Sequence, residues 1–329
     1  MNKLKVAIYW AAACGGCDIA IVELGKHLLD VDAIAEIALW PAAMDHNYAD
    51  VEALPDGAID LCLFNGAVRT SEQEHLAKLL RRKSKIMIAF GSCAHEGCIP
   101  ALANLKKRED ILSRVYRETP STANPDSVIP QPVTLVPEGE VPLPAFLEEV
   151  DTLAQTVEVD YFVPGCPPSA HQVWNVLQAV VQGQLPMKGS TVGVYEKTVC
   201  DQCPRVRLNT KVKAFHRPHL IVPDPERCFL EQGIICAGPA THAGCNKPGE
   251  PPLCISAGMP CRGCYGPPEG VADQGAKLLS AVASIIDSED EAEIQQILEG
   301  VVDPVGTFYR FSLSDSLLRQ VAGHKEKRQ

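Results

Sequence analysis

Residues 4–25, LKVAIYWAAACGGCDIAIVELG, join a strand-like segment to a helix-like segment through a loop that holds two cysteines. The apolar run over 4–10 predicts a buried strand, and the apolar spacing over 17–30 predicts a helix. Cys14 and Cys17 lie between them, where the strand ends. Two cysteines separated by two residues are typical of a redox disulfide, of half a zinc site or of half an iron–sulfur site. The positions of the remaining cysteines distinguish among these three kinds of site.

Strand-like and helix-like segments continue to alternate as far as residue 190. The helix over 71–84 is expected to begin at Ser71, with Glu74 as its partner in a capping box. Nearly continuous apolar strands that alternate with helices predict an α/β fold, a flavodoxin-like, doubly wound parallel sheet with helices on both faces. Further strands are predicted at 34–40, 59–68, 85–94 and 158–170, and further helices at 100–118 and 171–183.

The character of the sequence changes twice, which predicts three parts. These are an α/β domain over 1–190, a loop-rich and cysteine-rich segment over 191–270, and a helical C-terminal extension over 271–329. The middle segment has too few apolar residues to form a core alone, so another part of the protein must stabilise it. Residues 119–144 contain seven prolines and are expected to form a surface loop with neither a strand ladder nor a helix.

Composition and charge exclude several classes of protein. The formal net charge of −11 argues against a nucleic-acid partner, because phosphate binding needs a basic face. No apolar run approaches the 18 residues of a membrane span, and the N-terminus has no apolar signal core. The chain is therefore expected in the cytoplasm. In that reducing compartment its 14 cysteines are expected to be metal ligands rather than disulfides.

Four cysteines follow three different strands of the predicted sheet. Cys14 and Cys17 follow the first strand, Cys93 the fourth and Cys166 the fifth. The loops at the carboxyl ends of parallel strands converge, so the predicted topology brings all four thiols to one edge. Neighbouring glycines allow the backbone to approach closely and to direct N–H groups at sulfur. Four thiolates at this edge suit a [4Fe–4S] cluster or, less well, zinc.

The C-terminal segment supplies enough cysteines for two further quartets. A zinc site at the two Cys-x-x-Cys pairs, 200/203 and 261/264, would leave the other cysteines without a role. A thioredoxin-like motif at Cys14 and Cys17 would explain only those two. The eight cysteines are Cys200, Cys203, Cys228, Cys236, Cys245, Cys254, Cys261 and Cys264.

Two cysteines remain outside these quartets, and four of the nine histidines lie close to cysteines in the sequence. Cys62 is expected to be a small buried hydrophobic residue, because it lies inside an apolar strand. Cys98 lies close to Cys93 in the sequence and is a candidate neighbour of that site, or an occasional ligand. The histidines near cysteines are expected to face solvent rather than a cluster; they are His95, His216, His219 and His242.

Three cysteine motifs resemble, in their order and sequence context, those of [NiFe]-hydrogenase small subunits. They are the Cys-x-x-Cys at 14–17, the Gly-Ser-Cys-Ala turn at 91–94 and the Gly-Cys-Pro-Pro turn at 165–168. The resemblance covers about residues 1–270 and implies three clusters. A proximal cluster would take Cys14, Cys17, Cys93 and Cys166, a distal cluster Cys200, Cys203, Cys228 and Cys236, and a medial cluster Cys245, Cys254, Cys261 and Cys264.

Two positions depart from the best-known members of that family. Those members have histidine at the position of Cys200 and proline at the position of Cys254, and their medial cluster holds three irons. Cysteine at both positions here implies three [4Fe–4S] clusters. Spacing leaves open an exchange of ligands between the two C-terminal quartets.

The resemblance also implies a function and a set of partners. The chain has neither a Walker motif nor a dinucleotide fingerprint, so catalysis is expected on a partner, the [NiFe]-hydrogenase large subunit. Within the family, the chain is similar to the small, gamma subunits of cytosolic methyl-viologen-reducing hydrogenases. This similarity implies onward electron transfer to a [2Fe–2S] delta subunit and heterodisulfide reductase, in a flavin-based bifurcation complex. The alternative is an iron–sulfur electron-transfer module whose large-subunit-like partner lacks nickel.

Overall fold

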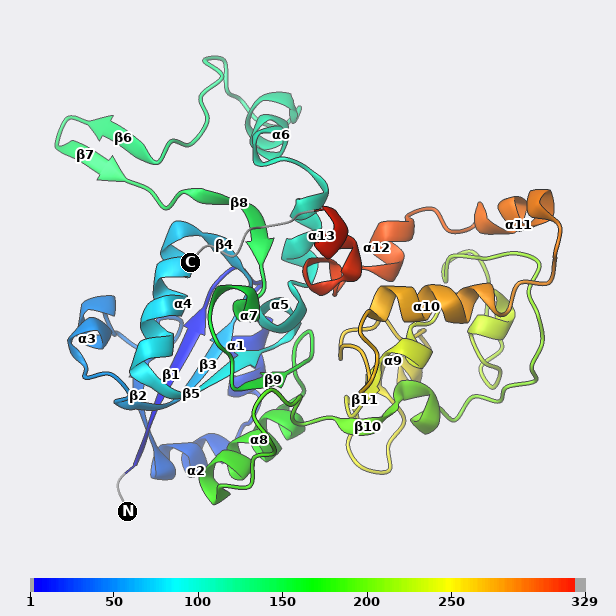
Figure 1. Ribbon diagram of the computed structural model, residues 1–329, viewed down its shortest axis with the longest axis horizontal. Coiled ribbons are helices and arrows are strands. Elements are labelled where there is room, and N and C mark those ends of the chain that lie inside the picture. Colours follow the sequence, from blue (N-terminus) through cyan, green and yellow to red (C-terminus); the bar gives the residue numbers. More distant parts are fainter. Residues whose placement is uncertain (1–2, 323–329) are drawn as a thin grey trace.

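A five-stranded parallel sheet lies at the centre of the N-terminal part of the computed structural model, which describes residues 3–322 (Figure 1). The strand order is β2-β1-β3-β5-β9, so the connections change direction between β1 and β3. This is the flavodoxin-like order, and the predicted fold class is confirmed. The strands are β1 (Leu4–Trp10), β2 (Ala35–Leu39), β3 (Ile59–Asn65), β5 (Ser84–Phe90) and β9 (Tyr161–Val163).

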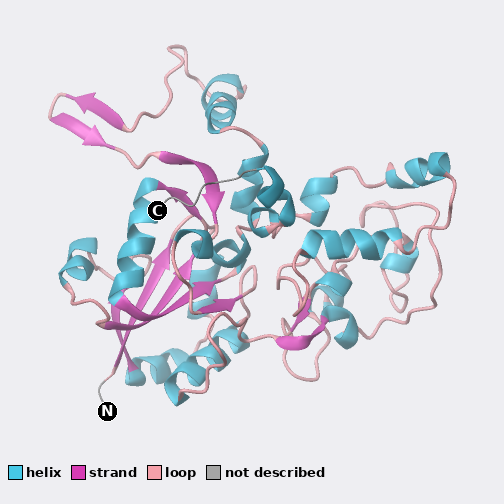
Figure 2. Cartoon of the chain, viewed as in Figure 1, coloured by secondary structure: helices cyan, strands magenta, loops and turns pink. Residues whose placement is uncertain are grey.

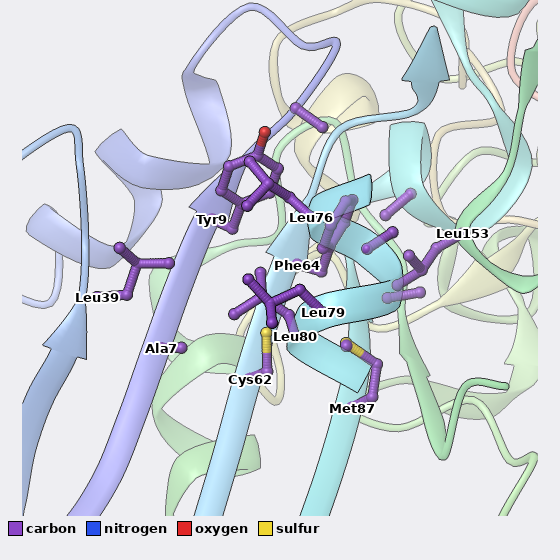
Figure 3. Packing of buried hydrophobic residues seen from close by; sticks show 14 of the residues in the cluster. Ala7, Tyr9, Leu39, Cys62, Phe64, Leu76, Leu79, Leu80, Met87 and Leu153 are labelled. Atoms are coloured by element: carbon purple, nitrogen blue, oxygen red, sulfur yellow. The ribbon is translucent and has the colours of Figure 1, made fainter. Parts of the chain in front are cut away.

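Helices cover both faces of this sheet because its strands are apolar on both sides. Along β3, Cys62 and Phe64 belong to the hydrophobic core on one face, and Leu61 and Leu63 to the core on the other. Figure 3 shows the first core, where Leu76 and its neighbours on the adjoining helix pack on β3 and β5. Cys62 is completely buried there, so its prediction as a small hydrophobic residue is confirmed.

The two faces carry different sets of helices. The core around Cys62 is covered by α3 (Tyr48–Ala53), α4 (Ser71–Lys83) and α7 (Leu153–Thr156). The opposite core is covered by α1 (Gly16–Val22), α2 (His27–Ile34) and α8 (Ala170–Gln182). The single helix predicted over 17–30 is therefore wrong: α1 ends at Val22, and Gly25, with a φ of +58°, separates it from α2.

The start of α4 differs by one residue from the prediction. Thr70 is the N-cap: its hydroxyl accepts the Gln73 N–H, and the Gln73 side-chain oxygen accepts the Thr70 N–H at 3.1 Å. The predicted capping pair, Ser71 and Glu74, is wrong because both side chains have other partners. The Ser71 hydroxyl accepts the Ala145 N–H, and Glu74 forms an ion pair with a lysine one turn later.

The long connection between β5 and β9 holds more regular structure than the sequence predicts. Its proline-rich part forms an exposed antiparallel hairpin of β6 (Val133–Val136) and β7 (Gly139–Pro142), which projects from the body in Figure 1. The prediction of no ladder is wrong because Pro137 lies at the turn and Pro142 ends its strand. The remaining elements are α5 (Ser92–Glu96), the 3₁₀ segment Ile99–Leu105, α6 (Arg108–Ser113), the π-helical turn Arg114–Glu118, and β8 (Phe146–Asp151), which pairs with β4 (Val68–Thr70).

The cysteine-rich segment and the C-terminal helices share one hydrophobic core. Phe215, Phe229 and Ile234 from the first pack with Leu278 and Phe308 from the second. The tail thus supplies the apolar surface that the middle segment lacks; the part boundaries at 190 and 270 stay a prediction. Figure 2 shows how much of this part is loop. Its elements are β10 (Tyr195–Thr198), β11 (His242–Ala243), α9 (Leu253–Ser256), α10 (Gln274–Ala283), α11 (Glu291–Leu298), α12 (Pro304–Phe308), α13 (Leu317–Ala322) and the 3₁₀ turns Val199–Gln202, Leu230–Gln232, Gly238–Ala240 and Leu313–Asp315.

The end of the tail returns to the first part of the chain. The Ser314 hydroxyl donates to the carbonyl of Val150 at 2.7 Å, and Arg319 forms ion pairs with Glu149 and Asp151. These contacts join the tail to β8. None of the helices between residues 3 and 322 has both the length and the apolar character that a membrane span requires.

A buried carboxylate fixes the end of the sheet opposite the cysteines. Asp160, 1% exposed, accepts hydrogen bonds from Arg81 (2.6 Å) and from the Met87 N–H (2.7 Å), and it pairs with Lys188 (2.6 Å). Burial acts to raise the pKa of Asp160, but these partners outweigh it and hold that pKa below its usual value. The charged form therefore stabilises the fold above about pH 4, and this contribution is lost as the pH falls further.

We expect Asp160→Asn to lower the free energy of unfolding at pH 7 by about 2–4 kcal/mol, because it leaves Arg81 without a carboxylate in a largely buried position. Thermal or urea unfolding of the purified protein measures this. Asp32→Asn is the matched control: Asp32 is 84% exposed and lies 3.6 Å from Lys3, so its loss should cost less than about 1 kcal/mol. Equal effects of the two substitutions would contradict the role assigned to Asp160.

Candidate functional site

The loops that carry the first four cysteines meet at the carboxyl edge of the sheet. The N–H of Gly91, after β5, donates to Val163 in β9 at 2.7 Å, and the N–H of Ser92 donates to Gly165 at 2.9 Å. The Ser92 hydroxyl accepts the Gly165 N–H at 3.2 Å and donates to the carbonyl of Cys264 at 2.6 Å. One serine thus ties the Cys93 loop to the Cys166 loop and to the cysteine-rich segment.

The thiols in these loops are near neighbours. Burial raises the pKa of the Cys17 thiol, and the thiols of Cys166 and Cys14 raise it further. A Cβ atom on Gly91 would lie only 2.4 Å from the sulfur of Cys17, so the absence of a side chain there makes room for the thiol. Cys93 packs with Cys98 and Phe311 in the same region. The structure therefore brings the four predicted residues to one edge.

This group lies at the surface of the chain. Cys14 and Cys166 are exposed, whereas Cys17 and Cys93 are buried. Large apolar side chains are exposed beside them: Trp10 is 44% exposed and Ile19 on α1 is 58% exposed. The N–H of Gly16 donates to the sulfur of Cys14 at 3.4 Å, as expected of a backbone that directs N–H groups at thiolates.

Cys98 adds a fifth thiol to this region. It is completely buried, and its sulfur lies 3.8 Å from the sulfur of Cys166. Its backbone has a positive φ of 47°, and its N–H donates to the carbonyl of Phe311 at 2.9 Å. The candidate neighbour role is consistent with this position.

Cys200, Cys203, Cys228 and Cys236 form a second group of thiols. Burial raises the pKa of Cys200 to about 12; Arg207 opposes this, and the thiols of the other three add to it. Burial also raises the pKa of Cys236 to about 11, which N–H groups of Gly238 and Cys261 oppose. Gly238 leaves room for the sulfur of Cys200, since a Cβ there would lie only 3.0 Å from it, and the sulfur of Cys236 would lie 3.7 Å away, in ordinary contact.

Cys245, Cys254, Cys261 and Cys264 form the third group, which lies between the other two. Burial raises the pKa of Cys264 to about 12, and the thiols of Cys254, Cys166 and Cys245 add to it. Burial likewise raises the pKa of Cys261, with the largest thiol contribution from Cys236. The Cys261 N–H donates to the sulfur of Cys236 at 3.2 Å. The third group therefore contacts the first through Cys264 and the second through Cys261.

The histidines near the cysteines differ in exposure. His219 is exposed, as expected, but His242 is only 6% exposed and its Nδ1 lies 3.1 Å from the carbonyl oxygen of Tyr195. The solvent-facing prediction is thus wrong for His242. His95 and His216 are half-buried, and the His95 ring packs on Phe162 with 4.8 Å between centroids.

Two further residues of this region contribute to the site, and the sequence did not predict them. The Tyr265 hydroxyl donates to Gln172 on α8 at 2.8 Å and accepts the Ser169 N–H at 3.1 Å, which holds the third group against the first. Glu96 is buried, and neither carboxylate oxygen has a hydrogen-bond partner in the described part of the chain. Their only signal in the sequence is adjacency to cysteine turns.

The three groups offer the ligand chemistry that iron–sulfur clusters require. Among residues 3–322, no three His, Cys, Asp or Glu side chains come close enough together to hold one metal ion. Each group nevertheless combines four thiols with glycines or N–H groups close to sulfur, and in the third group the N–H groups of Leu253 and Gly263 donate to the sulfurs of Cys245 and Cys261. Thiolates are the ligands that hold iron–sulfur clusters. The residues present therefore fit iron–sulfur clusters.

Known proteins similar to this chain are described as subunits of hydrogenases and related oxidoreductases. The family model described as NADH ubiquinone oxidoreductase, 20 Kd subunit, matches residues 14–180. The iron-sulfur subunit of the F420-non-reducing hydrogenase of Archaeoglobus profundus is 42% identical over 323 residues, covering 96% of this chain and 98% of its own. A vhu subunit of the F420-non-reducing hydrogenase of Methanocaldococcus jannaschii is 37% identical, covering 97% and 98%.

Solved structures support the fold. A chain of the [NiFeSe] hydrogenase from Desulfovibrio vulgaris Hildenborough matches with a TM-score of 0.51 over 82% of this chain and 95% of its own. The sequences are only 15% identical, so this likeness concerns the fold alone.

We expect Gly91→Ala to reduce the iron and acid-labile sulfide content, because the added Cβ would lie 2.4 Å from the sulfur of Cys17 and displace it. Chemical analysis of anaerobically purified protein measures both. Gly57→Ala is the matched control, since Gly57 also has a positive φ (+71°) but has nothing within 4 Å of an added Cβ. Iron loss in both variants would point to backbone strain, and full iron in Gly91→Ala would contradict the close approach.

Proposed function

The chain belongs to the family of the NADH ubiquinone oxidoreductase 20 Kd subunit and is a hydrogenase subunit of an oxidoreductase complex, and we propose that it conducts electrons through three [4Fe–4S] clusters. Such a cluster, when bound, passes on one electron at a time at low potential. In this proposal the proximal cluster takes Cys14, Cys17, Cys93 and Cys166, the medial cluster Cys245, Cys254, Cys261 and Cys264, and the distal cluster Cys200, Cys203, Cys228 and Cys236.

The order of the three thiol groups is the single observation that carries this proposal. The Ser92 hydroxyl joins the Gly165 N–H to the carbonyl of Cys264, and Cys261 donates its N–H to the sulfur of Cys236. These contacts support a series that begins at the carboxyl edge of the sheet and continues through the third group to the second. A series of redox centres suits the conduction of electrons through the chain.

Electrons would enter at the exposed end of this series. Cys14 and Cys166 are exposed, and Trp10, Ile19 and Val22 present a large apolar surface beside them. Exposed apolar groups around a redox site favour a docked subunit that excludes water. We assign this surface to the [NiFe]-hydrogenase large subunit, which holds the Ni–Fe centre.

The onward route is proposed from the resemblance of the sequence. We infer that electrons leave through the distal group to a [2Fe–2S] delta subunit and then to heterodisulfide reductase, in a cytoplasmic complex. The names of the relatives in Archaeoglobus and Methanocaldococcus, F420-non-reducing hydrogenase, are consistent with an acceptor other than F420.

A second candidate is an electron-transfer module whose large-subunit-like partner lacks nickel. The matching family model favours it in one respect, because its description is that of a NADH ubiquinone oxidoreductase subunit. Nickel analysis and hydrogen-dependent viologen reduction by the anaerobically purified complex separate the two candidates. We expect nickel and hydrogen-dependent reduction. Intact clusters without nickel and without hydrogen-dependent reduction would contradict the hydrogenase assignment but not the electron-transfer role.

Cys254→Pro tests the division of the C-terminal cysteines. Cys254 is the second residue of the short helix α9, where the N–H has no intrahelical acceptor, so proline removes no helical hydrogen bond. We expect the medial cluster to lose one iron and to give a three-iron signal by electron paramagnetic resonance in the oxidised state. Cys62→Ala, a buried cysteine in the sheet core, is the control and should keep the wild-type spectrum and iron content. An unchanged spectrum in Cys254→Pro would mean that Cys254 is not a medial ligand.

A further inference from the structure

A cavity of about 470 Å³ lies against the cysteine-rich segment and the helical tail. Three arginines line it, Arg217, Arg262 and Arg310, together with His216 and His219. Asp303 is the one carboxylate among its lining residues. This concentration of positive charge occurs in a chain with a formal net charge of −11.

The cavity is separate from the thiol groups. Of the twelve cysteines proposed as ligands, Cys261 alone lines it, whereas a space that holds a cluster would be bounded by all four cysteines of a group. The cavity therefore lies beside the third group and requires another occupant.

The arginines of the cavity lack acceptors. Within residues 3–322 no hydrogen bond or ion pair of the Arg217, Arg262 or Arg310 side chains is found. Arg310 is half-buried, and so is Arg81 in the first part of the chain, but Arg81 is paired with Asp160. Burial lowers the pKa of Arg310, and the neighbouring charge of Arg262 lowers it further. Arg217 and Arg262 are exposed to solvent, so an anion can reach them, and the like charges of Arg262 and Arg310 repel each other less when an anion lies between them.

The single carboxylate of the cavity does not neutralise them. An Asp303 carboxylate oxygen accepts the Gly306 N–H at 2.9 Å and so caps α12. Asp303 attracts the charge of Arg310 but forms no ion pair with it among the described residues. The positive charge of the cavity therefore stays in excess.

Apolar side chains form the other part of the lining. Ile235, Leu278 and Val301 contribute to it, and Met259 (43% exposed) and Val302 (67% exposed) present further apolar surface. The volume is within the range of sites for small organic ligands. We propose that this cavity binds a small organic anion, whose phosphate or carboxylate groups contact the three arginines and whose apolar body contacts these aliphatic side chains.

Binding of inorganic pyrophosphate tests the anionic half of this proposal. Isothermal titration calorimetry is done under anaerobic conditions on the complete complex, at low and at near-physiological salt. We expect saturable binding to one site per chain. Arg310→Ala and Arg217→Ala, which flank no proposed ligand cysteine, should each weaken it about tenfold or more. Arg82→Ala, an exposed arginine at the end of α4, is the control and should bind as the wild type does.

Several outcomes would overturn the proposal. These are an absence of binding at millimolar pyrophosphate, or equal binding by wild-type, Arg310→Ala and Arg217→Ala proteins. If an acidic side chain of a partner subunit fills the cavity, the complex will not bind pyrophosphate and Arg310→Glu will weaken assembly; that result also overturns it. Iron content and viologen reduction measured on the same samples show that the variants are folded, and keep this test independent of the electron-transfer proposal.

Discussion

The convergence of loops at one edge of a parallel sheet is the constraint on which the rest of the structure depends. All five strands run in the same direction, so the segments that follow β1, β5 and β9 leave the sheet at the same edge. The loops that follow β1 and β5 also need a small residue to approach each other, because Gly91 leaves the space that the sulfur of Cys17 occupies. Ser92 then binds the Cys93 loop to the Cys166 loop and to the carbonyl of Cys264. The same edge thus positions the first thiol group and docks the segment that carries the third.

The remainder of the chain has a different source of stability. The cysteine-rich segment is mostly loop, and its core is completed by Leu278 and Phe308 from the C-terminal helices. Its buried thiols have raised pKa values, so each thiol that becomes a ligand must give up a proton that burial makes harder to lose. A bound cluster would supply the positive charge of its irons, which offsets this cost. In this region, folding and cofactor binding are therefore expected to be coupled, whereas the sheet has an apolar core of its own.

Charge is distributed very unevenly over this acidic protein. In the sheet, Arg81 is neutralised internally by Asp160. Beside the third thiol group, Arg262 and Arg310 are adjacent and lack such a partner within the described residues. An electron-transfer subunit functions inside an assembly, so charges and apolar surfaces left without partners in one chain indicate where other molecules bind. The exposed apolar surface at Trp10, beside Cys14, is a second place where the chain alone leaves side chains without a partner.

The sequence by itself predicted a flavodoxin-like parallel sheet and the convergence of Cys14, Cys17, Cys93 and Cys166 at one edge of it, because apolar strands that alternate with helices form a parallel sheet whose loops converge at the carboxyl ends of the strands. It also identified Cys62 as a core residue. It could not determine the cap of α4, since Ser71 and Thr70 are both suitable caps and only the contact of Ser71 with Ala145 distinguishes them. Nor could it reveal the burial of His242, which depends on contact with Tyr195, 47 residues away in the chain. The proline-rich hairpin is a local structure that the proline content concealed, because Pro137 lies at its turn and Pro142 at the end of a strand. The medial place of the third thiol group was implied by the resemblance and not by spacing, because spacing along a loop-rich segment does not fix direction in space. The tertiary structure alone decided which residues join the groups: Ser92 contacts Cys264, and Cys261 contacts Cys236.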